Sequence, residues 1–333
     1  GRESGVLRSG LDFGQPGAMS AVVISGTITG GIGDGSGSVI AGGTLGAITV
    51  GSTAAPAADA VKGGDGLFSG SISARGKIST VKITGNVLAG IGADSGALLS
   101  YERSAAEGDL PGSLGSVSIS GNFASHVRAD GALGSLTTTA WTGGSLLTGA
   151  GALGDGSAGT IRIRGDLTQA QISIGGKLKL LSVGDDTTDT TLRVLEDISA
   201  LTFAGDVATS SLLAGFTANG AAVNPDARIG TVTVGGNWSA SNLVAGVAAG
   251  TDGDFGTTDD VKATGEDLAT ILSRIASVTI RGTVSGAPGE DFGFVAQHVA
   301  KMKVGTTVHP LNALADSQVI AIVAGVTIRE AGL

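Results

Sequence analysis

The chain has 333 residues, a net charge of −9 and an isoelectric point near 4.7. Because this charge repels a phosphate backbone and the 20 Lys and Arg residues are scattered, we expect no nucleic-acid partner. The absence of cysteine excludes disulfides and thiolate chemistry, and the longest apolar run is too short to span a membrane.

The chain begins at Gly1 without an initiator methionine or an apolar leader. We therefore expect a processed mature form or a fragment, from which any export signal has been removed. With 59 glycines, 6 prolines and 3% aromatic residues, the composition indicates neither collagen nor disorder. It is typical of a narrow aliphatic core with many turns.

One short phrase recurs along the chain, and its clearest copy is Ile229 to Asn237. An apolar residue is followed by two usually small residues, then by an apolar, a polar and an apolar residue, and usually by Gly. This alternation predicts a β-strand with one buried face. The nearest copies lie 19 or 20 residues apart (133 − 114 = 19, 178 − 158 = 20), which predicts a solenoid. The copies begin at Leu45, Ile78, Leu114, Leu133, Ala158, Leu178, Ile198, Ile229, Ile275 and Val299.

A turn follows several copies, and in it Gly precedes Asn or Asp. These residue types tolerate left-handed backbone geometry. If successive coils stack about 4.8 Å apart, we expect the Asn and Asp side chains to form a ladder that binds backbone groups of the next coil. The turns are Gly85-Asn86, Gly121-Asn122, Gly165-Asp166, Gly205-Asp206 and Gly236-Asn237.

These patterns predict an all-β fold, a single-stranded right-handed parallel β-helix (solenoid) of about 11 coils that forms one domain over residues 1–333. The phrase also matches the leucine-rich repeat, in which a helix or helical turn follows each Asn. Turn and strand formers follow Asn237 and Gly184 instead, so we favour the β-helix.

Three longer segments follow Ala-Gly steps, and we expect them to leave the solenoid at one corner and make one functional face. They are residues 91–113, 216–228 and 247–274. Two short helices are predicted there. One spans Ala97 to Glu107, and the other is capped by Thr264, with Asp267 at its third position. The apolar residues of the second are Leu268, Ile271 and Leu272.

The repeated Gly-rich phrase of Ile229 to Asn237 resembles the β-solenoid repeats of large bacterial cell-surface and secreted proteins, such as the passenger regions of autotransporter-like adhesins. The resemblance covers most of the chain and specifies architecture better than activity. It implies a secreted or cell-surface location, an adhesive or structural role, and extracellular matrix or surface polysaccharide as partner.

The richest acidic segment lies in the third insertion, where Asp252, Asp254, Asp259 and Asp260 alternate with Gly and Thr. Such spacing can wrap oxygen ligands around Ca²⁺. The segment is similar to the Asp-Gly-rich calcium loops of bacterial repeat proteins, but it departs from the EF-hand because the twelfth residue from Asp252 is Ala263. We predict a calcium loop at these four carboxylates, with a solvated acidic turn as the alternative.

A polysaccharide lyase or glycoside hydrolase is the enzymatic alternative, because parallel β-helices also carry such enzymes. The best carboxylate cluster for it is Asp185, Asp186 and Asp189 beside Arg193, in a Thr-rich turn. A solvated turn is the competing interpretation of this cluster. We expect no zinc site, because no zinc-binding spacing links the histidines, which are His126, His298 and His309.

We therefore expect a non-enzymatic structural or adhesive module, a stiff rod that displays loops. The residues from Val326 onward still have the pattern of a strand and carry no obvious polar cap. An exposed strand edge at this end predicts further repeats or end-to-end association of molecules into fibres.

Overall fold

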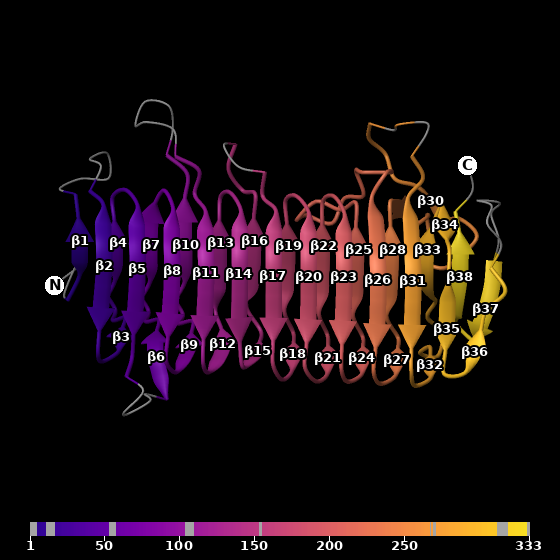
Figure 1. Ribbon diagram of the computed structural model, residues 1–333, viewed down its shortest axis with the longest axis horizontal. Helices are drawn as coiled ribbons and strands as arrows, with labels where there is room; N and C mark the ends of the chain where they lie inside the picture. Colours follow the sequence, from indigo (N-terminus) through magenta and orange to yellow (C-terminus); the bar gives the residue numbers. More distant parts are fainter. Residues whose placement is uncertain are drawn as a thin grey trace. The chain divides into compact units, whose positions relative to one another are not determined.

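The computed structural model describes residues 5–10, 17–52, 58–103, 110–152, 155–266, 268, 271–311 and 319–331 (Figure 1). Its contacts divide the chain into two compact units, Gly1–Arg164 (unit 1) and Gly165–Leu333 (unit 2), which are described separately. Every regular element in the described residues is a β-strand. No helix in this part of the chain has the length and apolar character needed to cross a bilayer.

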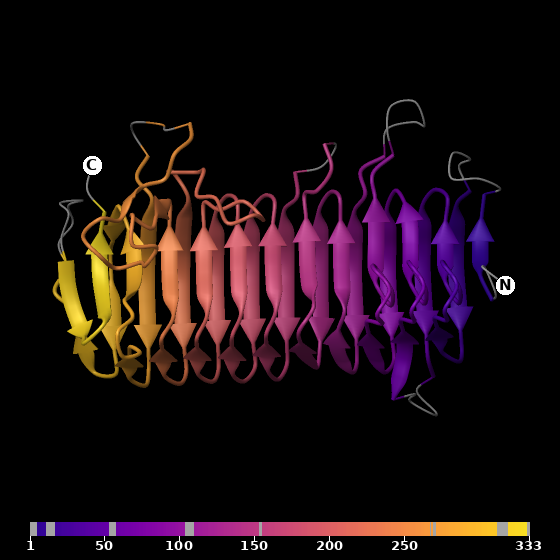
Figure 2. The same cartoon turned by 180° about the vertical axis from the view of Figure 1, so that it is seen from behind.

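The strand order is that of a parallel β-helix, as predicted. Three long sheets, A, B and C, run along the β-helix, and each coil contributes one strand to each of them. Within a coil the chain passes from sheet B to sheet C and then to sheet A (Figure 2). In unit 1, sheet A contains β1 (Leu7–Ser9), β4 (Val39–Ala41), β7 (Ile72–Arg75), β10 (Leu98–Tyr101), β13 (His126–Ala129) and β16 (Ser145–Thr148). Sheet B contains β2 (Met19–Ile24), β5 (Leu45–Val50), β8 (Ile78–Ile83), β11 (Leu114–Ile119), β14 (Leu133–Thr138) and β17 (Ala158–Ile163). Sheet C contains β3 (Ile28–Thr29), β6 (Asp59–Lys62), β9 (Asn86–Leu88), β12 (Asn122–Ala124) and β15 (Ala140–Thr142).

Unit 2 repeats this arrangement. Its sheet A contains β19 (Gln171–Ile174), β22 (Thr191–Val194), β25 (Ser211–Ala214), β28 (Asn242–Ala245), β33 (Phe292–Ala296), β38 (Val326–Glu330) and β37 (Val319–Val323). Sheet B contains β20 (Leu178–Val183), β23 (Ile198–Phe203), β26 (Arg228–Val234), β31 (Arg274–Ile280), β34 (His298–Val299), β35 (Met302–Val304) and β36 (Thr307–Val308). Sheet C contains β18 (Leu167–Thr168), β21 (Thr187–Thr188), β24 (Val207–Ala208), β27 (Trp238–Ser239) and β32 (Val284–Ser285), and a separate hairpin joins β29 (Val247–Ala248) to β30 (Val261–Lys262).

The repeated phrase forms sheet B, and its apolar positions are the core. In β8 the side chains of Ile78, Val81 and Ile83 are at most 1% exposed, and each pairs in register with the equivalent apolar residue of β11. Because like residues stack on adjacent coils, every layer is filled by its neighbours. Burying one such aliphatic side chain stabilises the fold by roughly 1.5–3 kcal/mol.

The few large aromatic side chains fill this narrow core. Trp238 is fully buried, and the centre of its ring lies 5.1 Å from that of Phe294. Its indole Nε1–H donates to the carbonyl of Ser241 at 3.0 Å, so the buried polar group is satisfied. In unit 1, Trp141 packs edge-on against Phe123 at 5.0 Å.

The predicted Asn and Asp ladder is confirmed at the turn between sheets B and C. In unit 1 the backbone N–H of Asn122 donates to Asn86 Oδ1 at 2.9 Å. In unit 2 the N–H of Asp206 donates to Asp186 Oδ1 at 2.8 Å, and that of Asn237 donates to Asp206 Oδ1 at 2.7 Å. Each side chain therefore satisfies a backbone donor of the following coil.

The predicted short helices are not present in the described residues. Leu98–Tyr101, at the start of the first predicted helix, is β10, because Leu98 fits in register between Ile72 and Val127. Stacking in the core thus overrides local helix propensity. Residues 104–107 lie outside the described residues. Thr264 and Gly265 form a bend, Leu268, Ile271 and Leu272 are irregular, and Asp267 lies outside the described residues.

The three insertions reach one corner, as predicted, but the first segment begins at another. The Ala-Gly step at Gly90 follows a strand of sheet C, and residues 91–97 lead to β10 in sheet A, after which the rest of segment 91–113 connects β10 to β11 of sheet B. The Ala-Gly steps at Gly215 and Gly246 end strands of sheet A, so segments 216–228 and 247–274 also leave between sheets A and B. The same dipeptide occurs at two different corners, which local sequence does not distinguish.

The strand that begins at Val326 is covered on both sides. It pairs in parallel with β33 and antiparallel with β37, so the edge of sheet A lies at β37 and not at β38. The antiparallel pairing of β37 covers the edge of β38, for which the sequence shows no polar cap. Val319 and Val323 on β37 are 47% and 38% exposed.

Candidate functional site

The predicted calcium loop is held together by its own hydrogen bonds. Asp259 Oδ2 accepts from the N–H of Thr251 at 2.6 Å and from its hydroxyl at 3.0 Å, and Asp259 Oδ1 accepts from the Thr257 hydroxyl at 2.6 Å. The hydroxyls of Thr257 and Thr251 hold the pKa of Asp259 far below its usual range. This carboxylate is therefore ionised, but its oxygens already serve as acceptors within the loop.

The other carboxylates of the loop point to different partners. Asp252 Oδ1 accepts from the N–H of Asp254 at 3.0 Å, whereas Asp260 is buried and accepts from the N–H of Gly256 at 2.8 Å. Burial raises the pKa of Asp260 to about 6, although the Gly256 N–H and the charge of Arg329 lower it. The calcium site at Asp252, Asp254, Asp259 and Asp260 stays a prediction.

The Asp185, Asp186 and Asp189 cluster is divided between two corners. Asp185 and Asp186 precede β21 in the turn ladder, and Asp189 follows β21 at the next corner, with a φ of 51°. Within the described residues, the carboxylates that approach one another within 4.8 Å as a group of three are Asp166, Asp185 and Asp186. All three are exposed, and Asp166 and Asp186 are rungs of the ladder, so their proximity has a structural cause.

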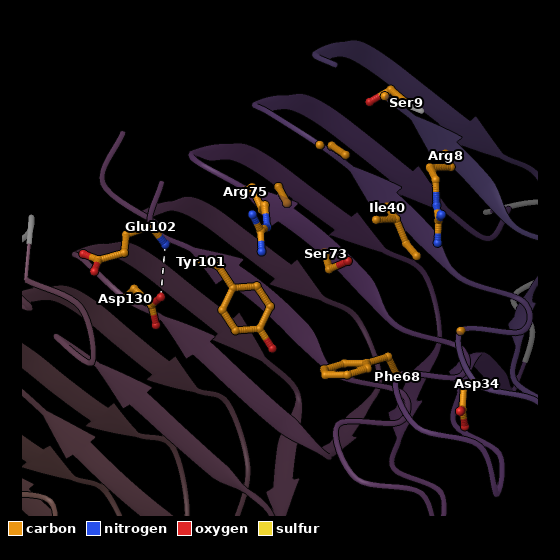
Figure 3. Close-up of a pocket in the computed structure, with 15 residues that line it drawn as sticks. Arg8, Ser9, Asp34, Ile40, Phe68, Ser73, Arg75, Tyr101, Glu102 and Asp130 are labelled. Carbon is orange, nitrogen blue, oxygen red and sulfur yellow. Dashed lines mark hydrogen bonds between the residues drawn. The ribbon is translucent and has the colours of Figure 1, made fainter. Parts of the chain in front are cut away.

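A groove of about 570 Å³ lies on the outer face of sheet A in unit 1 (Figure 3). The outward side chains of β1, β4 and β7 form its floor, because Arg8, Ile40 and Ser73 occupy one register row on adjacent coils. Figure 3 shows Arg8 and Arg75 on the same face, with Ile40 and Ser73 between them and the rings of Phe68 and Tyr101 along the groove. The groove thus combines cationic donors with flat apolar surfaces, the usual lining of a ligand site.

The same face of sheet A is covered in unit 2. There the outward residues Leu213, Val244 and Val295 are at most 6% exposed, and they form a cluster with Phe216. Phe255 packs against this cluster, with its ring 6.2 Å from that of Phe216. Both phenylalanines belong to insertions, so these segments close in unit 2 the face that stays open in unit 1.

Three Gly-rich loops stack beside the groove, and the first two line it through Asp34, Gly35 and Phe68. They are residues 30–38, 63–71 and 90–97, each between sheets C and A. In each loop a buried serine hydroxyl accepts from the N–H five residues earlier, at 2.8 to 3.0 Å. The serines are Ser36, Ser69 and Ser95.

The loops also bond to one another, which fixes the residues that face the groove. Gly35 N–H donates to the carbonyl of Leu67 at 2.7 Å, and Phe68 N–H donates to that of Ala93 at 2.9 Å. Asp34 Oδ1 accepts from the N–H of Leu67 at 3.1 Å. Phe68 is 40% exposed and is therefore available to a ligand.

Tyr101 lies between cationic and anionic neighbours at the other end of the groove. The guanidinium of Arg128 lies 5.2 Å from the centre of its ring, within cation–π range. Burial, followed by the charge of Asp94, raises the pKa of Tyr101 to about 12. The phenol is therefore neutral at physiological pH and can donate a hydrogen bond.

The carboxylates of the groove are tied to neighbouring donors. Asp130 Oδ1 accepts from Arg128 Nε at 2.7 Å, and Asp130 Oδ2 accepts from the N–H of Glu102 at 3.0 Å. Glu102 Oε2 accepts from the N–H of Ala152 at 2.7 Å. These contacts fix the positions of Glu102 and Asp130 at the end of the groove near Tyr101.

Sequence reasoning missed this groove because it singled out carboxylate clusters. The residues of its floor lie on adjacent coils, and no motif along the chain links them. One signal was present: a Ser-Gly pair recurs at Ser36, Ser69 and Ser95, each before a strand of sheet A. Asp34 to Gly37 and Ala93 to Gly96, in two of these loops, form turns.

Comparison of the chain with protein-family models, curated proteins and solved structures found no match.

Proposed function

We propose that this chain is a non-enzymatic structural and adhesive module of a secreted bacterial surface protein, and that the groove of unit 1 binds an extended polysaccharide. The observation that carries the proposal is the open face of sheet A, where Phe68 and Tyr101 lie beside Arg8, Arg75 and Ser73.

The chemistry of the lining suits a carbohydrate. Sugar rings have an apolar face that stacks on aromatic rings, and their hydroxyls accept hydrogen bonds from guanidinium and hydroxyl groups. The floor extends from β1 to β4 to β7 at the spacing of the coils, so an extended chain can lie across three successive coils. A volume of about 570 Å³ is within the range of small-ligand sites.

A polysaccharide-cleaving enzyme is the alternative, because Glu102 and Asp130 lie together at one end of the groove. Against it, both oxygens of Asp130 accept from Arg128 and Glu102, which suits a positioning role better than proton transfer. The Asp185 and Asp189 pair supports this alternative less, since β21 separates the two residues.

The test measures both binding and cleavage. Affinity electrophoresis and calorimetry with polyuronides and neutral glycans, with and without Ca²⁺, would show binding, and release of reducing or unsaturated ends would show cleavage. Phe68→Ala should weaken binding several-fold, because the loss of a stacking face makes the binding free energy less favourable by roughly 1 kcal/mol. Ile32→Ala is the matched control, since Ile32 is 86% exposed in the neighbouring loop and does not line the groove.

Glycan binding without turnover, weakened by Phe68→Ala and not by Ile32→Ala, supports the proposal. Turnover that Asp130→Asn or Asp189→Ala abolishes would replace it with the enzymatic alternative. Absence of binding to every glycan tested would remove the polysaccharide from the proposal.

A further inference from the structure

A second hollow, of about 400 Å³, lies on the outer face of sheet B in unit 2. Three basic residues from successive coils line it, because Arg228 of β26 pairs with Arg274 of β31, and Arg274 pairs with His298 of β34. Gly230 and Ala276 are the small residues beside this row, and Leu272 of the third insertion also lines the hollow.

The basic side chains have no partners in the structure. Within the described residues, neither guanidinium takes part in a hydrogen bond or salt bridge, and the Nε2 atom of His298 is buried without a hydrogen-bond partner. Arg228 and Arg274 are exposed, and no acidic residue lines the hollow. In a chain with a net charge of −9, this is a local concentration of positive charge.

Two arginine side chains in register on adjacent strands repel each other unless a negative charge lies between them. Like charges directly opposite each other on neighbouring strands repel. Two acids beside the row have other partners: Asp197 accepts from the backbone N–H of Arg228 at 3.0 Å and pairs with Lys177 at 3.7 Å, and Asp226 Oδ2 accepts from the N–H of Leu268 at 3.1 Å. Asp226 Oδ1 is buried without a hydrogen-bond partner, and Glu330 accepts from the N–H of Val299 at 2.8 Å. Among the described residues, no salt bridge joins a carboxylate to the three basic side chains of the row.

We propose that Arg228, Arg274 and His298 form a binding site for a tetrahedral oxyanion, a sulfate or phosphate group. Guanidinium groups donate paired hydrogen bonds to such anions, and the ring nitrogen of His298 supplies a further donor from the adjacent coil. Donors on three successive coils engage different oxygens of one tetrahedral group. The hollow is open, so the group can be a free ion or an ester on a longer chain.

The experiment follows the ring signals of His298 by long-range ¹H–¹⁵N NMR while sodium sulfate, sodium phosphate or a sulfated oligosaccharide is added at constant ionic strength, with sodium chloride as the reference. The chain has three histidines, so His126 and His309 serve as internal references and His298→Gln assigns the signal. Saturable shifts of the His298 signals are expected with sulfate or phosphate and not with chloride.

Arg228→Gln and Arg274→Gln should each weaken binding roughly tenfold or more, because a charge-assisted hydrogen bond is lost. Lys179→Gln is the matched control: it removes one positive charge from an exposed outward position of β20, outside the hollow. Melting curves of all variants confirm folding and separate the general salting effect of sulfate from binding, since that effect is common to every variant.

Loss of the His298 shifts in both arginine variants, with Lys179→Gln unchanged, supports the site. If the oligosaccharide binds and inorganic sulfate does not, the site recognises the ester on its polymer. Equal responses to sulfate and chloride, or binding that both arginine variants retain, would overturn the proposal.

Discussion

Tyr101 is the residue whose ionisation best reports the state of the unit 1 groove. It is the only tyrosine in the chain, so ultraviolet absorbance of the phenolate measures it directly. Its pKa is about 12 in the folded protein because of burial and the charge of Asp94, against 10.0 for an ordinary tyrosine in water. We expect its titration near pH 12 and near pH 10 in denaturant.

The sign of the stability effect follows from this shift. A group whose folded pKa lies above its unfolded pKa contributes stability below the unfolded value and loses it as the pH rises. The contribution of Tyr101 is therefore complete below pH 10 and disappears between pH 10 and about 12. Tyr101→Phe should flatten the unfolding free energy across that window, and a slope that stays unchanged would contradict the assignment.

At the level of single residues, the sequence predicted the core better than the site. The inward positions of the phrase are buried as expected, because period-two alternation directly encodes which face is apolar. Arg8, Arg75 and Phe68 were not predicted to meet. They are brought together by the stacking of coils, and no spacing along the chain reports that register.

At the level of elements, the Gly-rich loops depend on one glycine each. Gly70 has a φ of +66°, and a Cβ there would lie 2.2 Å from the carbonyl oxygen of Lys62. Gly70→Ala should lower the unfolding free energy by at least about 1–2 kcal/mol, because it adds backbone strain and a clash with main chain. Thermal or urea unfolding would measure this loss.

Gly35→Ala is the control for that experiment. Gly35 has the same φ of +66°, but a Cβ there would meet nothing within 4 Å. Phe68 and Asp94 occupy the equivalent position of the next two loops with φ values of 54°. We therefore expect a smaller loss for Gly35→Ala, and equal losses in the two variants would show that the clash at Gly70 does not matter.

Helices were predicted where strands or irregular segments occur, and the reason lies in the repeat itself. Ala97 to Glu107 contains good helix formers, yet Leu98 continues an apolar column from Ile72 to Val127. Residues that complete a column gain more from burial than from helix propensity. The column was visible only once the coil containing β10 had been aligned with its neighbours.

At the level of the whole molecule, the edge strand β37 is where the prediction of self-association can be tested. Unpaired strand edges favour association, and Val319 and Val323 are partly exposed there. If molecules associate end to end, as the sequence predicts, the apparent mass in light scattering should rise with concentration and fall in Val323→Lys. Ile91→Lys adds the same charge at a residue that is 88% exposed in unit 1, so it should have no effect. A constant monomeric mass at millimolar protein would exclude association.

The Asn and Asp ladder also affects how such a chain changes length. The coils that begin at Leu178 and Ile198 are 20 residues apart (198 − 178 = 20), and each presents the same acceptor to the next, Asp166 to Asp186 and Asp186 to Asp206. Removal of residues 178–197 would bring Asp166 opposite Asp206 with every column and rung in register. Gain or loss of one whole coil in the gene therefore preserves the fold. Coils of other lengths also keep the ladder, because the N–H of Asn237 donates to Asp206 across 31 residues. Loss of a single residue displaces the inward side chains only where it falls within a strand.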